Sequence, residues 1–153
     1  MITTPEVLDT TAQPATMIHL VIQRSEMARY MDPAIQEILK VLADQGVAPS
    51  GPMFSYHLRR PSDTFDFQIG FPVSGAIQPA GRVVNGELPA KKVVRAVHQG
   101  PYEGLAQGWQ SLEEWVRQQG HGGTGRFWER YLTNPAEVKS PSEYRTELNW
   151  VIS

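Results

Sequence analysis

Two matching stretches decide the fold of this chain: GPMFSYHL at residues 51–58 and GRFWERYL at residues 125–132. Each is followed by a second matching stretch, FDFQIGFPV at residues 65–73 and YRTELNWVI at residues 144–152. These stretches alternate well enough between two faces to be antiparallel strands. The pattern predicts two hairpins built on one plan. Because matching positions carry different types of side chain, it also predicts a pseudo-symmetric pocket in which only one repeat supplies the functional residues.

Upstream of the first hairpin the sequence predicts a strand and a helix. Residues 17–23 form a short apolar, β-branched run that is typical of a largely buried strand. For the helix, we expect Asp32 as the N-cap, Pro33 as the first helical residue and Gly46 as the left-handed stop. The apolar face of this helix is predicted to consist of Ile35, Ile38, Leu39 and Leu42.

The same order precedes the second hairpin. Residues 93–98 are predicted to form the strand, and residues 100–104 the turn into a helix that ends near Gly120. One apolar stripe is expected on this helix, formed by Leu105, Trp109, Leu112 and Val116.

These elements predict an α+β fold of tandem strand-helix-strand-strand repeats. We expect an antiparallel sheet with both helices on one face and a ligand cleft between the repeats. Because each half alone is marginal in size, a single domain is predicted over residues 1–153. Its predicted parts are a loose N-terminal arm or extra edge strand (1–14), a first repeat (15–73), a connection (74–92) in which Val83 and Val84 add a short strand, and a second repeat (93–152).

Composition narrows the function. The 153 residues carry a net charge of −2 and no concentrated basic stretch, which argues against direct nucleic-acid binding. The absence of cysteine and the scattered positions of four histidines argue against a metal site, and we expect no cofactor. With neither a signal peptide nor an apolar run long enough to span a membrane, the cytoplasm is the expected location.

Two glutamates distinguish the second repeat from the first. If the second hairpin is symmetric about residue 138, Glu129 and Glu147 lie directly opposite each other, where the first repeat has Ser55 and Gln68. Two like charges in an apolar setting leave one carboxyl protonated unless a cation lies nearby, so the pair is a plausible recognition device.

Other interpretations of the glutamates stay open. A glutamate on a sheet is commonly a solvated surface residue, and neighbouring arginines (Arg126, Arg130 and Arg145) can neutralise either one. A register shifted by one residue turns Glu147 to the opposite face.

Aromatic residues gather near the predicted seam between the repeats. Rings around a carboxylate favour a large, flat or cationic organic ligand. The helical spacing of Trp109 with Leu105 and Leu112 is equally typical of core packing. The predicted ligand-binding set is Glu147, Glu129, Tyr131, Trp128, Tyr56, Trp109, Tyr102 and Trp150.

Three further stretches carry a resemblance to a known family: VHQGPYEGL at 97–105, WERYLTNP at 128–135 and RTEL at 145–148. In combination they resemble the GyrI-like small-molecule-binding domain, which also serves as the effector-binding domain of MerR-type and AraC-type multidrug regulators. The resemblance spans about residues 15–152. It implies a tandem-repeat fold with a cleft in which aromatic rings and an acidic residue bind lipophilic, often cationic compounds.

By position, the resemblance implies Glu147 as the acidic residue, with Tyr131, Trp128 and Tyr56 as aromatic walls. No helix-turn-helix segment precedes residue 16, so we expect a stand-alone binding domain rather than a transcription factor. A homodimer or another protein partner is compatible with the sequence.

Three functions remain open at this point. The first is binding of lipophilic or cationic small molecules, for sensing or sequestration. The second, allowed by the resemblance, is a hydrolase that opens cyclopropane rings of DNA-alkylating natural products, with Glu147, Glu129 and Tyr131 as candidate catalytic residues. The third is an interaction protein that inhibits gyrase by surface contact.

Overall fold

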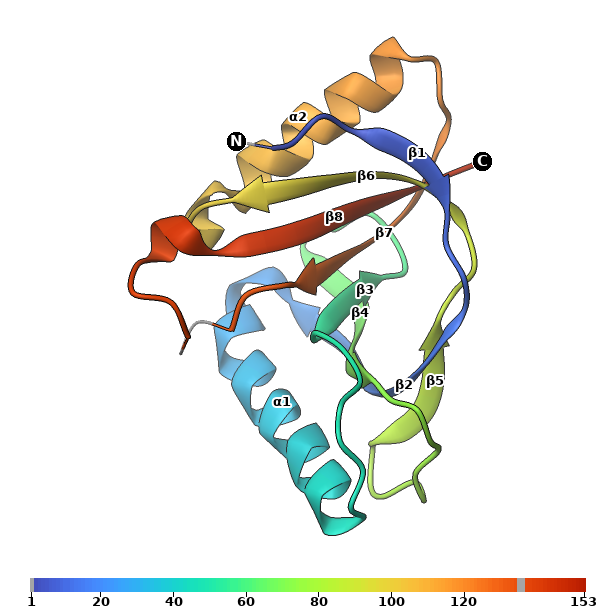
Figure 1. Ribbon diagram of the computed structural model, residues 1–153, viewed down its shortest axis with the longest axis vertical. Coiled ribbons are helices and arrows are strands. Elements are labelled where there is room, and N and C mark those ends of the chain that lie inside the picture. The colour runs from blue at the N-terminus through green and yellow to red at the C-terminus, as the bar shows by residue number, and fades with distance from the viewer. Residues whose placement is uncertain (1, 135–136) are drawn as a thin grey trace. The chain divides into compact units, whose positions relative to one another are not determined.

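The computed structural model describes residues 2–134 and 137–153. Met1, the first residue of the predicted arm, and Pro135, the last residue of one motif quoted above, lie outside the described residues. The chain folds into two compact units (Figure 1). One consists of residues 11–90, and the other combines residues 1–10 with residues 91–153.

The unit of residues 11–90 is a four-stranded antiparallel sheet with one helix. Its strands follow the order β3-β4-β2-β5. The elements are β2 (Gln13–Gln23), a 3-10 turn (Arg24–Glu26), α1 (Met27–Asp44), β3 (Phe54–His57), β4 (Thr64–Pro72) and β5 (Val84–Leu88). Helix α1 covers the face of the sheet that bears Ile18, Leu20, Phe67 and Ile69, against which Ile38 and Leu42 are fully buried.

Helix α1 begins earlier than predicted. Its first residue is Met27, no side chain caps its N-terminus, and Pro33 lies inside the helix, so the predicted Asp32 cap is wrong. An interior proline removes a backbone hydrogen bond. The additional turns form nonetheless, since Met27 and Met31 extend the apolar stripe and pack against the same core. The C-terminal prediction is confirmed, because Gly46 follows the helix with a φ of 70°.

The unit that contains the C-terminus has the same plan, with four strands and one helix; its outer strand next to β6 comes from the N-terminus, whereas the outer strand next to β2 is β5. Its sheet has the order β1-β6-β8-β7, again antiparallel. The elements are β1 (Glu6–Asp9), β6 (Lys92–Gln99), a 3-10 turn (Tyr102–Gly104), α2 (Leu105–Gln118), β7 (Gly123–Tyr131), a second 3-10 turn (Pro141–Glu143) and β8 (Arg145–Ile152). Within the predicted N-terminal arm, β1 pairs with β6 at the edge of the sheet.

Helix α2 lies along one face of this sheet (Figure 1). Leu112 and Val116 of the helix are buried against alternate residues of the strands, namely Val94, Ala96, Leu148, Trp150 and Phe127. Close packing also requires small residues at the start of the helix. A Cβ atom at Gly108 would lie 3.0 Å from Nδ1 of His98.

The α+β prediction is confirmed, with each helix covering one face of its own sheet. The repeat alignment is confirmed at the level of strand register as well. In β3 and β4, Ser55 lies opposite Ile69, and at the matching positions of β7 and β8, Glu129 lies opposite Leu148. Within the described residues, no helix is long and apolar enough to cross a membrane.

Candidate functional site

The register of β7 and β8 separates the two glutamates. Glu129 lies opposite Leu148, and Glu147 lies opposite Arg130. The expected direct pairing of Glu129 with Glu147 is therefore wrong by one residue, and a one-residue shift places two side chains on opposite faces of a sheet. Glu129 faces α2, whereas Glu147 lies on the face that α2 does not cover.

Glu129 lies in a partly buried position under α2. Its Oε1 accepts a hydrogen bond of 3.1 Å from Nε1 of Trp109, and Tyr131 donates a second hydrogen bond to the carboxylate. Burial raises the pKa of Glu129 above its usual range, although both hydrogen bonds act in the opposite direction. Among the described residues, no cationic side chain pairs with this carboxyl group.

Aromatic rings continue on both sides of Glu129. Toward the surface, Tyr102 packs edge-on against Tyr131 at 6.2 Å between ring centroids and lies 4.9 Å from Tyr144. Toward the core, the ring of Trp109 is 4.8 Å from Phe127 and 6.0 Å from Trp150. Because Tyr102 is 40% exposed, this cluster extends from the core to the surface of the unit.

The hydroxyl group of Thr146 is a further polar feature of this face. Thr146 lies opposite Tyr131 on one side and His98 on the other, and it is fully buried. Its Oγ1 has no hydrogen-bond partner among the described residues. Buried polar groups are normally paired, so this hydroxyl adds an unused donor and acceptor beside Glu129. Sequence reasoning did not select Thr146 or Tyr144 for the site, although both lie an even number of residues from Leu148 and Trp150, the spacing at which residues of a strand share a face.

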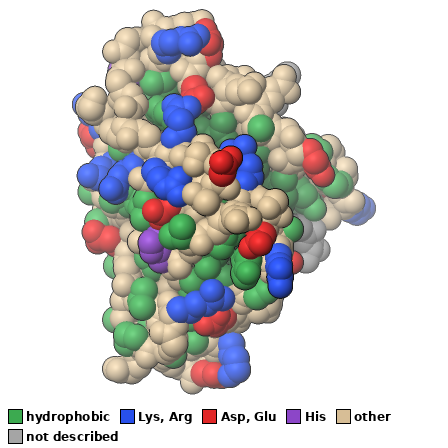
Figure 2. Space-filling model, turned by 180° about the vertical axis from the view of Figure 1, so that it is seen from behind, with side chains coloured by type: hydrophobic (Ala, Val, Ile, Leu, Met, Phe, Trp, Pro, Cys, Tyr) green, Lys and Arg blue, Asp and Glu red, His purple; other side chains and the backbone are tan. Residues whose placement is uncertain are grey.

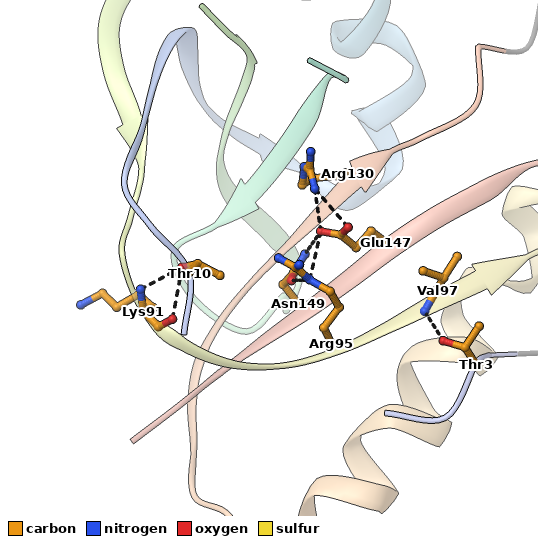
Figure 3. Close-up of polar contacts among 8 residues, drawn as sticks. All are labelled: Thr3, Thr10, Lys91, Arg95, Val97, Arg130, Glu147 and Asn149. Atoms are coloured by element: carbon orange, nitrogen blue, oxygen red, sulfur yellow. Dashed lines mark hydrogen bonds and ion pairs between the residues drawn. The ribbon is translucent and has the colours of Figure 1, made fainter. Parts of the chain in front are cut away.

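Glu147 has a different environment (Figure 3). Its carboxylate accepts hydrogen bonds of 3.1 and 3.0 Å from Nη1 of Arg130 and one of 3.0 Å from Nδ2 of Asn149. Nε of Arg95 lies 3.2 Å from the same carboxylate and donates a 2.7 Å hydrogen bond to Oδ1 of Asn149. Both carboxylate oxygens are thus engaged by side chains of the same sheet.

The structure brings part of the predicted set together. Five of the predicted residues lie on the α2 side of the C-terminal sheet: Glu129, Tyr131, Tyr102, Trp109 and Trp150. Glu147 and Trp128 lie on its other face, the latter only 2% exposed. Tyr56 is buried in the other unit, on the face of its sheet that α1 does not cover.

Two other kinds of site, a metal site and a pocket elsewhere on the surface, do not coincide with the predicted set among the described residues. No group of three or more histidine, aspartate or glutamate side chains there is placed to hold a metal ion. A surface hollow of about 530 Å³ lies in the unit of residues 11–90 and shares no residue with the predicted set, being lined by Gln23, Arg24, Ser25, Ser62, Asp63 and Thr64. In the view of Figure 2, basic and acidic side chains are interspersed, and no extended basic patch is seen.

Replacing Glu147 with glutamine is expected to destabilise the fold by about 2 kcal/mol, because two guanidinium groups lose their buried counter-charge. Chemical denaturation of the wild type and the variant measures this effect. Glu114→Gln, which removes an exposed carboxylate paired with Arg117 on α2, is the matched control and should change the free energy of unfolding little. Equal stability of all three proteins would contradict a structural role for the Glu147 network.

The fold and the aromatic cluster define a class of protein: a tandem-repeat α+β domain with a carboxyl group enclosed by rings. The family comparison agrees with this description. The chain belongs to the family of GyrI-like small-molecule-binding domains, which it matches over residues 3–152. A search of curated proteins found no significant match.

Solved structures share the fold. The C-terminal domain of EcmrR superimposes with a TM-score of 0.84 at 18% identity, over 98% of this chain and 97% of that domain. In the EcmrR–DNA complex the TM-score is 0.83 at 20% identity, and the chain spans only 57% of the EcmrR chain. SAV2435 bound to tetraphenylphosphonium gives 0.70 at 13% identity over 99% of this chain and 94% of that one. A hydrolase from Listeria innocua gives 0.66, also at 13% identity, over 97% and 91%.

Proposed function

We propose that this chain binds lipophilic, positively charged small molecules on the α2 side of its C-terminal sheet, with Glu129 as the acidic contact. The observation that carries the proposal is the environment of Glu129. Its carboxyl group has two neutral hydrogen-bond donors, Trp109 and Tyr131, and no cationic partner among the described residues.

The electrostatics favour a cation. A carboxylate removed from water without a counter-charge is costly, and burial accordingly raises the pKa of Glu129. A ligand that brings a positive charge to this position stabilises the ionised form. Glu147, by contrast, already has two arginine partners and gains less from a further cation.

The surrounding rings favour a lipophilic ligand with aromatic groups. Trp109 and Tyr131 donate hydrogen bonds to the carboxyl group, and Tyr102 packs edge-on against Tyr131, so aromatic rings lie around the carboxyl group. A desolvated cation over such a ring gains on the order of 0.5–2 kcal/mol. Tyr102, which is partly exposed, is the residue that an entering ligand meets first in this proposal.

Tetraphenylphosphonium and tetraphenylborate provide a direct test, since they have nearly the same shape and opposite charges. The first is also the ligand of the structural relative SAV2435. Titration followed by tryptophan fluorescence should show saturable binding of the cation and at least about 30-fold weaker binding of the anion, a difference of about 2 kcal/mol. Equal affinities would reject the electrostatic part of the proposal, and no binding of either compound would reject the proposal as a whole.

Binding of tetraphenylphosphonium should also depend on pH. The ligand carries a permanent charge, and its binding lowers the pKa of Glu129 relative to the raised value in the free protein. Affinity is therefore expected to fall as the pH is lowered through that raised pKa and to level off above it. Titrations from pH 7 to pH 4.5 measure the slope, and a flat profile would contradict the proposed contact.

A hydrolase that divides acid and base roles between Glu129 and Glu147 receives no support from the register, since the two carboxyl groups lie on opposite faces. The likeness to the Listeria innocua hydrolase, at 13% identity, concerns the fold. Binding is thus the function that the contacts of Glu129 support best.

A further inference from the structure

We propose that the other face of the same sheet carries a second site, for an oxyanion such as a carboxylate or phosphate group, formed by Arg95 and Arg130 around Glu147. The side chains involved are shown in Figure 3. This site is separate from the one proposed for cations, because Glu129 and Glu147 project from opposite faces.

The first argument is the balance of charge. Arg95 and Arg130 both pair with Glu147, at 3.2 and 3.0 Å, while the remaining member of the network, Asn149, is neutral. Two guanidinium groups thus face one carboxylate. The arginine side chains are only 26% and 24% exposed, so the excess positive charge is partly withdrawn from water. A partly buried charge of this kind favours a counter-ion.

The second argument is the set of unused donors. Arg95 contacts Glu147 and Asn149 through Nε alone, and Arg130 contacts Glu147 through Nη1 alone. Both Nη groups of Arg95, and Nε and Nη2 of Arg130, have no protein partner among the described residues. A guanidinium group offers five N–H donors in a planar fork that matches carboxylate and phosphate oxygens.

The third argument is that the network holds the arginines in place. Nε of Arg95 is fixed by Oδ1 of Asn149 at 2.7 Å, and Asn149 in turn donates to Glu147 at 3.0 Å. Asn149 is fully buried and Glu147 is 7% exposed, so these two side chains form a rigid support for the arginines. An anion that binds here therefore meets arginines whose stems are already ordered, which reduces the entropic cost of binding.

Two further charged residues, Arg145 and Glu6, lie next to the network. Arg145, on the same face two residues before Glu147, is exposed, and its guanidinium has no partner among the described residues. Glu6 lies opposite Arg95 on β1, is exposed and forms no ion pair with it in the described part of the chain. Three arginines against two glutamates keep the local balance positive.

Spectra of the arginine Nε–H groups of the full chain test the proposal. Inorganic phosphate and acetate are titrated separately, with sodium chloride at matched ionic strength as the control. We expect saturable shifts of the Arg95 and Arg130 signals with at least one oxyanion, beyond those caused by chloride. The anion that binds more tightly assigns the chemical class. Shifts that follow ionic strength alone, without saturation, would overturn the proposal.

Two substitutions with opposite expected effects exclude a purely structural network. Arg95→Gln should weaken oxyanion binding about tenfold, because it removes charge-assisted donors. Glu147→Gln should strengthen it by a similar factor, because the competing carboxylate is lost. Arg117→Gln, in an exposed ion pair on α2, is the control. Circular dichroism confirms that each variant is folded. Unchanged affinity in Arg95→Gln, or weaker binding in folded Glu147→Gln, would refute the site.

Discussion

Replacing Glu129 with glutamine is expected to lower the affinity for tetraphenylphosphonium about 30-fold, equivalent to about 2 kcal/mol. The side chain keeps nearly the same size, and its amide oxygen can still accept the hydrogen bond from Nε1 of Trp109. The loss of affinity therefore reports the missing negative charge. Isothermal titration calorimetry at pH 7.5 measures the dissociation constants of both proteins.

The stability of Glu129→Gln separates a ligand contact from a structural residue. Because burial raises the pKa of Glu129, its ionised form opposes folding above that pKa, and the variant should be at least as stable as the wild type at neutral pH. Glu114→Gln removes an equal charge from an exposed position on α2 and should leave ligand affinity unchanged. A Glu129→Gln protein that is much less stable would assign this residue to the fold.

Acidification from pH 6.5 to pH 4 is expected to destabilise the fold by about 3 kcal/mol through His57 alone. This side chain is 6% exposed, and its ring stacks on Phe67 with 5.1 Å between centroids. Burial lowers the pKa of His57 from 6.5 to about 4. Since the unfolded chain binds the proton more tightly, the contribution of neutral His57 is complete above pH 6.5 and is lost as the pH falls toward 4.

Urea denaturation at several pH values, compared between the wild type and His57→Phe, isolates this effect. Phenylalanine retains an aromatic ring but cannot be protonated, so the variant should lose stability less steeply below pH 6.5. Glu129 contributes with the opposite sign, since its protonated form is favoured in the folded state, and that contribution is common to both proteins. Parallel pH profiles would contradict the neutral state of buried His57.

The repeat explains why much of the fold could be predicted. Side chains along a strand point alternately to its two faces, so every second residue lies on the buried face. In β4 this alternation indicates Phe65, Phe67 and Ile69 as the buried face. In β8 it indicates Thr146, Leu148 and Trp150. The ends of both helices could also be predicted from Gly46 and Gly120, because helices commonly end at a glycine with positive φ, and both glycines have this conformation.

The register of the second hairpin could not be predicted from the sequence. A centre of symmetry at residue 138 assumes that both strands end at equal distances from the middle of the loop. The connection contains a 3-10 turn at Pro141–Glu143, and the strands pair one residue away from the symmetric register. That single residue separates Glu129 from Glu147. The start of α1 was missed for a related reason, because burial of Met27 and Met31 outweighs the local signal of Asp32 and Pro33.

The partners of Glu147 could be found only in three dimensions. The sequence indicates Arg130 as a possible neutralising neighbour, but it carries no signal for Arg95 or Asn149, and Arg95 lies 52 residues from Glu147 in sequence. Antiparallel pairing of β6 with β8 brings them together, with Arg95 opposite Asn149. Of the two glutamates that distinguish the second repeat, only Glu129 is therefore proposed to bind the ligand. Its counterpart in the first repeat is Ser55.

Parallel titration of Glu129→Gln and Glu147→Gln with tetraphenylphosphonium tests the central claim most directly. The two substitutions are chemically identical and lie on neighbouring strands, on opposite faces of one sheet. We predict that affinity falls about 30-fold in Glu129→Gln and stays within about twofold of the wild type in folded Glu147→Gln. The reverse pattern, with affinity lost only in Glu147→Gln, would contradict the account.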